Sequence, residues 1–144
     1  MYRFLLVSLL LQFYIVSSGV HAQGAGKFLI NISGIQTATQ GDLLIYVYDE
    51  KTWLEQEQAL RMRVLEHAGH DQYQISFNDL PAGEYAIQVT HDSDNNGKLS
   101  MGLFGPSEGV GVSQYVPSFI PSFDKAKFSV KSEGVTLVPV VMSY

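Results

Sequence analysis

The fold class is indicated by residues 72–89, which read QYQISFNDLPAGEYAIQV. Apolar side chains occupy alternate positions before and after a central Pro-Ala-Gly turn sequence: Tyr73, Ile75 and Phe77, then Tyr85, Ile87 and Val89. A period of two is typical of a β-strand with one buried face, and proline and glycine favour a tight turn. The stretch therefore predicts two strands joined as a hairpin.

Strand patterns continue on both sides of this stretch. Residues 42–48, DLLIYVY, form an apolar run that is typical of a strand buried on both faces. A turn around Gly69 predicts that the strand before it and the strand that begins near residue 72 form another hairpin. Pro139 indicates that the last strand lies at a sheet edge or contains a bulge, because proline cannot donate a backbone hydrogen bond. The remaining predicted strands are residues 27–32, 60–65, 126–131 and 135–144.

These patterns define the expected architecture. Seven short strands separated by turn signals are typical of an all-β protein, and one or two helical turns are expected after a capping-box sequence that starts at Thr52. We expect a seven-stranded antiparallel sandwich, immunoglobulin-like or transthyretin-like, with one long Gly/Pro-rich loop. That loop, residues 92–125, holds 34 residues, among them five of the 13 glycines and three of the five prolines. Loops of this length are usually functional or disordered, and the many apolar residues of this one favour an ordered, functional loop.

The composition excludes several classes of protein. The chain has 144 residues, 46% of them hydrophobic, and no cysteine. This length is typical of one domain with its own core. The lack of cysteine excludes disulfides, thiolate metal sites and a cysteine nucleophile. A formal net charge of −5 disfavours nucleic acid as a partner, since phosphate binding needs a basic surface.

The first 22 residues have the pattern of a secretory signal peptide. Arg3 precedes an apolar stretch, Phe4 to Val16, and a small-residue cleavage sequence ends at Ala22. The alternative is a retained N-terminal anchor helix, but the stretch is shorter than the roughly 20 residues that span a bilayer. We therefore expect a single domain, residues 23–144, with a net charge of −6 and without a transmembrane segment, exported to the periplasm or the cell exterior.

The long loop begins with a calcium-binding pattern, DSDNNGKL, at residues 92–99. Calcium binds about six to eight oxygen atoms, and acidic and amide side chains at alternate positions can point their oxygens to one centre. Gly97 permits the sharp turn that would bring a backbone carbonyl to the same centre, and an acid from farther along the chain would complete the shell. The predicted calcium ligands are Asp92, Asp94, Asn96, the Lys98 carbonyl and Glu108.

The pattern departs from an EF-hand in its second half. Leu103 occupies the twelfth position, where a bidentate glutamate is expected, and Ser100 occupies the ninth. The alternative is a polar turn without metal, because Asn96-Gly97 is a strong turn sequence and aspartates readily bond to nearby backbone groups. The sequence leaves the two interpretations open.

Several short motifs lie along the second half of the chain: Asp79-Leu80-Pro81-Ala82-Gly83-Glu84-Tyr85-Ala86, His91-Asp92, Asn96-Gly97-Lys98-Leu99, Gly105-Pro106-Ser107-Glu108-Gly109-Val110-Gly111-Val112-Ser113 and Pro121-Ser122-Phe123-Asp124-Lys125-Ala126. Together they resemble the secreted bacterial family called domain of unknown function 2141. The resemblance covers residues 27–144 and implies a secreted sandwich without an established activity. The chain departs from the family pattern at Ser100, where the family tends to carry an aspartate.

Three functions are compatible with the sequence. The first is a non-catalytic exported module that binds an unknown protein or small molecule or has a structural role. The second is a carrier or sensor of a small apolar or carbohydrate ligand held under the loop by Phe104, Tyr115 and Phe119. The third is a small hydrolase, which would need a histidine, a carboxylate and a hydroxyl in one cleft. No catalytic motif surrounds Ser113, and His67 and His70 fall in a predicted turn, so a non-enzymatic role is expected.

Overall fold

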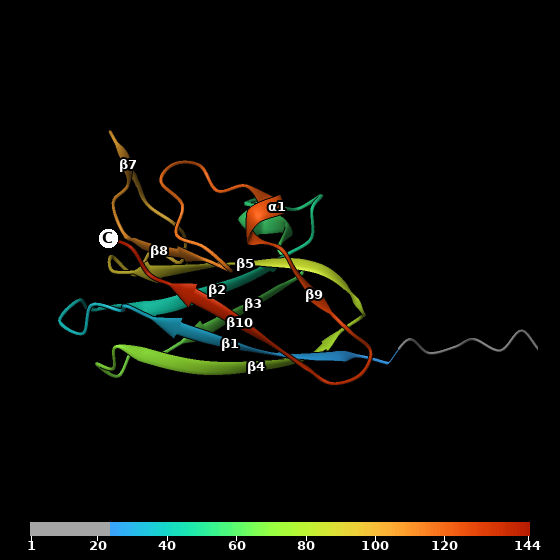
Figure 1. Ribbon diagram of the computed structural model, residues 1–144. Coiled ribbons are helices and arrows are strands. Elements are labelled where there is room, and N and C mark those ends of the chain that lie inside the picture. The colour runs from blue at the N-terminus through green and yellow to red at the C-terminus, as the bar shows by residue number, and fades with distance from the viewer. Residues whose placement is uncertain (1–23) are drawn as a thin grey trace, which may run out of the picture.

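The computed structural model describes residues 24–144, so the predicted signal peptide, residues 1–22, lies outside the described residues. Two β-sheets pack face to face, and the loop elements lie over the outer face of one of them (Figure 1). No helix in the described part of the chain is long and apolar enough to cross a membrane. The expected sandwich is confirmed, and all seven expected strands are present.

The smaller sheet has three strands and the larger sheet has five. In the smaller sheet the order is β10 (Val135–Val141), β1 (Gly26–Ser33) and β4 (Gln72–Leu80). In the larger sheet the order is β3 (Arg61–Leu65), β2 (Asp42–Tyr48), β5 (Gly83–Asp92) and β8 (Gly109–Val112), and β9 (Phe128–Val130) pairs with the first residues of β5. The other elements are η1 (Gln56–Gln58), α1 (Phe123–Ala126) and the hairpin of β6 (Met101–Gly102) and β7 (Gly105–Pro106).

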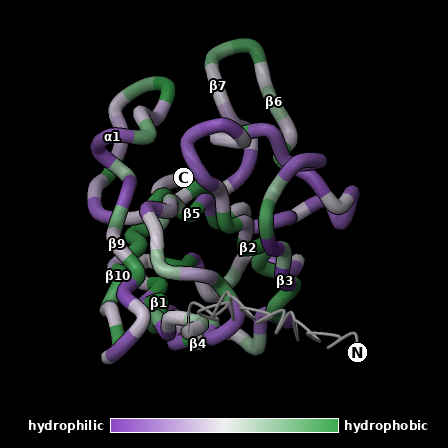
Figure 2. Tube along the Cα trace, turned by 90° about the vertical axis from the view of Figure 1, so that its right-hand side faces the viewer, coloured by the Kyte–Doolittle hydropathy of each residue, from purple (hydrophilic) through white to green (hydrophobic). Residues whose placement is uncertain are grey.

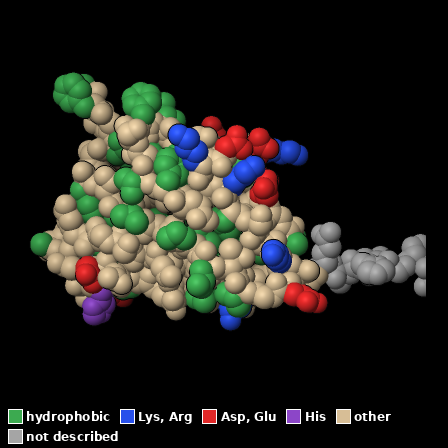
Figure 3. Space-filling view, viewed as in Figure 1, with side chains coloured by type: hydrophobic (Ala, Val, Ile, Leu, Met, Phe, Trp, Pro, Cys, Tyr) green, Lys and Arg blue, Asp and Glu red, His purple; other side chains and the backbone are tan. Residues whose placement is uncertain are grey.

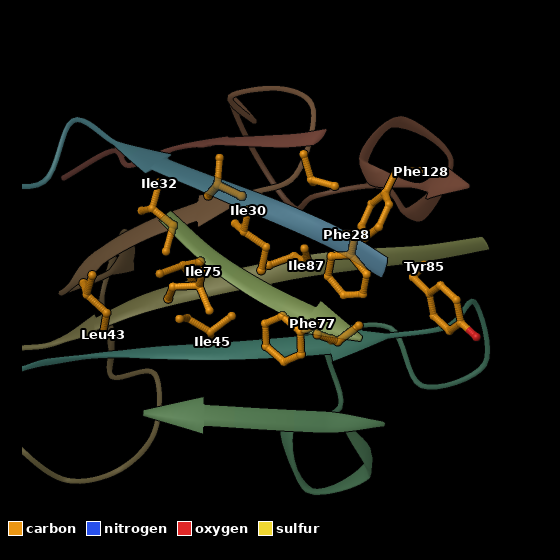
Figure 4. Close-up of a cluster of buried hydrophobic side chains, with 14 of the residues drawn as sticks. Phe28, Ile30, Ile32, Leu43, Ile45, Ile75, Phe77, Tyr85, Ile87 and Phe128 are labelled. Carbon is orange, nitrogen blue, oxygen red and sulfur yellow. The ribbon is translucent and has the colours of Figure 1, made fainter. Parts of the chain in front are cut away.

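The core lies between the two sheets. Alternate side chains of β1, β2, β4, β5, β9 and β10 point inward and are almost completely buried, as Figure 4 shows for Ile30, Ile45, Ile75 and Ile87. Each fully buried aliphatic side chain contributes about 1.5–3 kcal/mol to folding. Phe28 stacks on Phe77 with ring centroids 5.2 Å apart and fills the end of the core near the start of β5.

The strand pairing differs from the prediction in three places. β3 and β4 lie in different sheets, and so do β4 and β5, so neither predicted hairpin forms. Instead β4 pairs with β1, and β5 pairs with β2. β1 and β10 run parallel, an exception in an otherwise antiparallel structure. Alternation shows that a strand has one buried face but does not specify its partner, and these turns carry the chain from one sheet to the other.

The larger sheet is covered on its outer face as well. β2 is buried on both faces, as its apolar run predicts: Leu44, Tyr46 and Tyr48 form a separate cluster on the outer side. Trp53 packs there with its ring edge toward Tyr48 and donates a hydrogen bond to the Pro121 carbonyl (3.0 Å). The long loop is thereby attached to the sandwich as an ordered layer, which Figure 2 shows above β2 and β5.

The predicted capping box at Thr52 and Glu55 does not form. The Thr52 hydroxyl donates to Asp49 Oδ1 (3.0 Å), and the same carboxylate oxygen accepts the Thr52 backbone N–H. Asp49 therefore organises this turn, and the helix here is the 3-10 segment η1, which starts after Glu55. Asp49 thus accepts the Thr52 N–H that Glu55 would accept in a capping box, and the Glu55 N–H donates to the Thr52 carbonyl (3.0 Å) instead.

Candidate metal centre

The site is built at the end of β5. Asp92 is the last residue of this central strand, where it pairs with Asp42 of β2, and its side chain is buried. The backbone then turns sharply, with positive φ angles at Asn95 (56°) and Gly97 (78°). The Tyr46 hydroxyl donates to the Gly97 carbonyl (3.3 Å) and fixes the turn over β2.

Strand pairing brings a second acid to this position. β8 lies antiparallel to β5, with Gly109 opposite His91. Glu108 therefore arrives beside Asp92, although 15 residues separate them in the chain. One oxygen each of Asp92, Asp94 and Glu108 lies within 4.8 Å of the other two. We call these three residues the acid trio.

Backbone amides orient the two buried carboxylates of the acid trio. Asp92 accepts the Asn96 N–H on Oδ1 (3.0 Å) and the Gly97 N–H on Oδ2 (2.9 Å). Glu108 accepts the Ser93 N–H on Oε1 and the Ser100 N–H on Oε2, both at 2.9 Å. A carboxylate oxygen has two lone pairs, so both Asp92 oxygens and Glu108 Oε2 keep capacity for a further partner. Glu108 Oε1 also accepts longer hydrogen bonds from the Ser93 hydroxyl (3.4 Å) and the Asp94 N–H (3.5 Å).

The acid trio concentrates negative charge. Asp92 and Glu108 are only 4% and 7% exposed. Among residues 24–144, the ion pairs join Arg61 to Asp79 and Lys127 to Glu84 and Asp124, so no cationic side chain pairs with the trio. Buried carboxylates without a positive partner are costly, and a divalent cation would remove most of that cost.

Neighbouring groups favour the ionised form of Asp94. A hydrogen bond from the Ser100 hydroxyl, together with bonds from Asn96, lowers the pKa of Asp94. His91 precedes Asp92, but burial and then the nearby His67 lower its pKa, so its imidazole is neutral at pH 7. The ionised form of Asp94 is therefore favoured, and the neighbouring His91 adds no positive charge beside the trio.

Asn96 and Lys98 hold the loop through hydrogen bonds of their own. The Asn96 amide nitrogen donates to Asp94 Oδ2 (2.9 Å) and to Ser100 Oγ (2.6 Å), and its Oδ1 accepts the Lys98 N–H (2.9 Å). For Asn96 to offer an oxygen to a cation at Asp94, its amide must flip. The structure thus brings together three of the five predicted ligands, and it turns the nitrogen of a fourth toward them.

Ser100 was not predicted as part of the site. Its hydroxyl donates to Asp94 Oδ2 (2.9 Å) and its N–H donates to Glu108, so it joins two members of the acid trio. Its position as the ninth residue of the loop, often a ligand position in calcium loops, was the available signal. A hydroxyl at this point can supply a further oxygen.

The histidines form a separate cluster on the inner side of β5. His91 is fully buried, its Nδ1 lies 2.6 Å from the Tyr144 hydroxyl, and its ring centroid lies 4.9 Å from that of His67. His67 and His70 both lie between β3 and β4, as predicted; His67 is half-buried with its Nδ1 3.2 Å from the Tyr73 hydroxyl, whereas His70 is exposed. Successive side chains of a strand point to opposite faces, so this cluster and Asp92 lie on opposite sides of the sheet.

Ser113 has a structural position. Its buried hydroxyl donates to the Ala126 carbonyl (2.6 Å) and accepts the Ile87 N–H (2.9 Å). It thereby joins the end of β8 to α1 and to β5. Both contacts of the hydroxyl are to backbone groups.

The residues proposed to line a ligand pocket under the loop do not face one another. Phe104 and Phe119 are largely exposed, while half-buried Tyr115 packs against the cluster around Phe123. An open groove of about 360 Å³ lies at the opposite end of β5. Its lining residues are Asp49, Leu60, Arg61, Leu80, Pro81, Gly83, Glu84 and Tyr85.

Comparison with known proteins gives one match. A family model described as "Uncharacterized protein conserved in bacteria (DUF2141)" matches residues 30–137, which extend from β1 into β10 and include the whole acid trio. No curated protein and no solved structure matches the chain.

Proposed function

The chain belongs to the DUF2141 family of uncharacterized bacterial proteins, and from that premise we propose that it is an exported, non-catalytic β-sandwich module whose long loop is stabilised by calcium. Export is supported by the basic residue, apolar stretch and small-residue cleavage sequence of residues 1–22. The loop that the cation would hold carries the surface available for partners. The partner of this loop belongs to one of three classes: a protein, a small molecule or a surface.

One observation carries the calcium proposal: two buried carboxylates and a third acid converge without a cationic side chain beside them. The donors are all oxygens, which suits hard cations and disfavours copper or zinc. Asp92 and Asp94 belong to the DSDNNG sequence, so local sequence and long-range strand pairing support the same site independently.

Calcium suits this donor set better than magnesium. It accepts irregular shells of about six to eight oxygens, whereas magnesium demands a regular octahedron. Carboxylates from the trio, loop carbonyls and water would supply these oxygens. Since the bidentate glutamate of high-affinity loops is lacking at Leu103, we expect a dissociation constant of about 10⁻⁴ to 10⁻³ M, as in extracellular modules.

The bound cation would connect three segments. Asp92 ends β5, Asp94 belongs to the turn, and Glu108 precedes β8 and accepts the N–H of Ser100 at the foot of the β6–β7 hairpin. Without cysteine, the chain cannot fasten this loop by a disulfide. A divalent cation would perform that role in an exported protein.

Thermal unfolding tests the proposal. After chelation and dialysis, 10 mM calcium should raise the free energy of unfolding by about 1.4–2.7 kcal/mol, given the expected affinity. The melting temperature should therefore rise by several degrees, and equal ionic strength from sodium chloride should not reproduce the rise. Isothermal titration calorimetry should give one site.

Matched variants locate the effect. Asp92→Asn and Glu108→Gln keep the shape of the side chains and remove one charge each, so both should lose the calcium-dependent rise. Asp71→Asn removes an exposed acid outside the trio and should keep it. A melting temperature unaffected by calcium, or a rise that survives in both trio variants, contradicts the proposal.

A further inference from the structure

Two loop tips of the protein present large apolar side chains to solvent. At the turn between β6 and β7, Leu103 is 96% exposed and Phe104 is 104% exposed. In the segment between β8 and α1, Phe119 is 84% exposed and Ile120 is 74% exposed. Single exposed apolar residues are common, but two adjacent pairs this exposed are typical of an interaction surface. We call these four residues the apolar tips.

The two tips extend in the same direction. In Figure 1 the β6–β7 hairpin and the loop that leads to α1 rise above the larger sheet, and Figure 2 shows the same two loops, coloured as hydrophobic at their ends, as the uppermost parts of the chain. Figure 3 shows two apolar projections on the same upper side. Since the vertical axis is common to these views, one flat surface can contact both tips.

Charge is excluded from the tips and placed beside them. Residues 99–107 and 109–123 contain no charged side chain, although the chain as a whole has a net charge of −5. The acid between them, Glu108, is buried in the acid trio. Exposed Lys98 directly precedes the first uncharged segment, and the exposed, oppositely charged Asp124 and Lys125 follow the second. Uncharged apolar tips match the hydrocarbon interior of a bilayer, and the long Lys98 side chain suits the anionic lipid headgroups that surround it.

We propose that the apolar tips dock the protein on the surface of a phospholipid bilayer, with their side chains in the interfacial layer. Both tips are convex and separate, so a protein partner would need two pockets at matching positions, whereas lipids rearrange around each tip. A second copy of the chain would present the same convex tips. Two open grooves beside Asp49 and Glu84 lie near the start of β5, at the end of that strand away from the acid trio, and charged residues line part of each. The proposal does not depend on calcium binding.

Vesicle flotation tests the proposal with the protein as the cell exports it. The wild type should float with vesicles of phosphatidylcholine and phosphatidylglycerol. The double variant Phe104→Ser Phe119→Ser should bind at least about tenfold more weakly, because each aromatic side chain loses its apolar contact with lipid. Leu137→Ser makes a similar change at an exposed position of β10 and should float as the wild type does. Mass spectrometry must show the same N-terminus in all three proteins, so that any binding by that segment is common to them.

A fluorescent reporter tests the depth of the contact. In the variant Phe104→Trp, the emission should shift to shorter wavelength when vesicles are added, whereas Leu137→Trp should show no shift. Circular dichroism should be unchanged in every variant, since all these side chains are exposed.

Three outcomes overturn the proposal. One is a wild-type protein that stays in the aqueous fraction. Another is flotation that the double tip variant and the wild type share equally. In the third, the wild type forms dimers in lipid-free solution, the double tip variant does not, and neither protein floats with vesicles. The tips would then bind a second copy of the chain.

Discussion

Ser113 shows how one small side chain connects distant segments. Its hydroxyl satisfies the Ile87 N–H and the Ala126 carbonyl, and the residue is 0% exposed. A buried backbone group that loses its partner costs about 1–3 kcal/mol. The hydroxyl therefore stabilises the junction of β5, β8 and α1 far more than its size suggests.

We expect Ser113→Ala to lower the free energy of unfolding by about 2–4 kcal/mol, since it leaves both backbone groups without a partner. Urea denaturation followed by fluorescence measures this loss. The control is Ser129→Ala, an exposed serine in β9 whose replacement should change the stability by less than about 0.5 kcal/mol. If the two variants are equally stable, the hydroxyl does not have this role.

At the residue scale, the spacing of residues predicted mainly the local part of the site. Asp92 and Asp94 are two residues apart, so their spacing alone indicates a shared centre. The bond between His91 and Tyr144 joins residues 53 positions apart and forms only because the sheets bring them together. No local pattern could have predicted it.

At the element scale, the β6–β7 hairpin depends on the acid trio. Its strands have only two residues each, and its base is held by the Ser107 N–H bond to the Ser100 carbonyl (3.0 Å) and by the Ser100 N–H bond to Glu108. Few other contacts protect these amides. The hairpin is therefore the part of the fold that calcium should affect most.

Hydrogen exchange should show this difference between elements. Calcium should slow exchange of the Ser100 and Ser107 amides, because closing the trio holds the base of the hairpin, while the Ile87 amide in central β5 should exchange slowly with or without calcium. Exchange measured by NMR with chelator and with calcium tests the expectation. Equal slowing across β5 and the hairpin would indicate a global effect instead.

β8 was absent from the predicted strands for a physical reason. Its sequence, GVGV, has glycines at alternate positions, and glycine is depleted in strands. The structure requires them: a Cβ at Gly109 would lie 2.2 Å from the Tyr144 ring, and one at Gly111 would lie 2.8 Å from Val140. These glycines make the strand hard to predict from the sequence, and they also allow β8 to approach the segment around β10 closely. β2, by contrast, was predicted with its observed bounds because its continuous apolar run reflects burial on both faces.

At the scale of the whole molecule, three tyrosines with raised pKa values make the stability decrease at alkaline pH. Burial is the first cause that raises the pKa of Tyr46, Tyr48 and Tyr144 above its usual value near 10. The unfolded chain would release these protons at lower pH than the folded protein. Their contribution to stability is therefore complete below about pH 10 and falls as the pH rises toward the folded-state values.

We expect the melting temperature to decrease steeply above about pH 10. Tyr48→Phe should make this decrease shallower, although it removes the hydrogen bond to Gln88 and so costs about 1 kcal/mol at neutral pH. Calorimetry between neutral and alkaline pH, with tyrosinate absorbance as a second measurement, checks both parts. If the melting temperature of Tyr48→Phe falls with pH as steeply as that of the wild type, Tyr48 ionises as readily in the folded protein as in the unfolded chain.

The position of β1 has a consequence for the time course of folding. β1 is the middle strand of the smaller sheet, between β4 from the centre of the sequence and β10 from its far end. β1 is synthesised early, and both of its edges therefore stay unpaired until β4 and β10 have been synthesised. Chains dominated by such non-local pairing fold slowly, within milliseconds to seconds, and their open edges favour aggregation in the meantime. In the living cell, the interval before β10 pairs with β1 is when this protein most needs protection by chaperones.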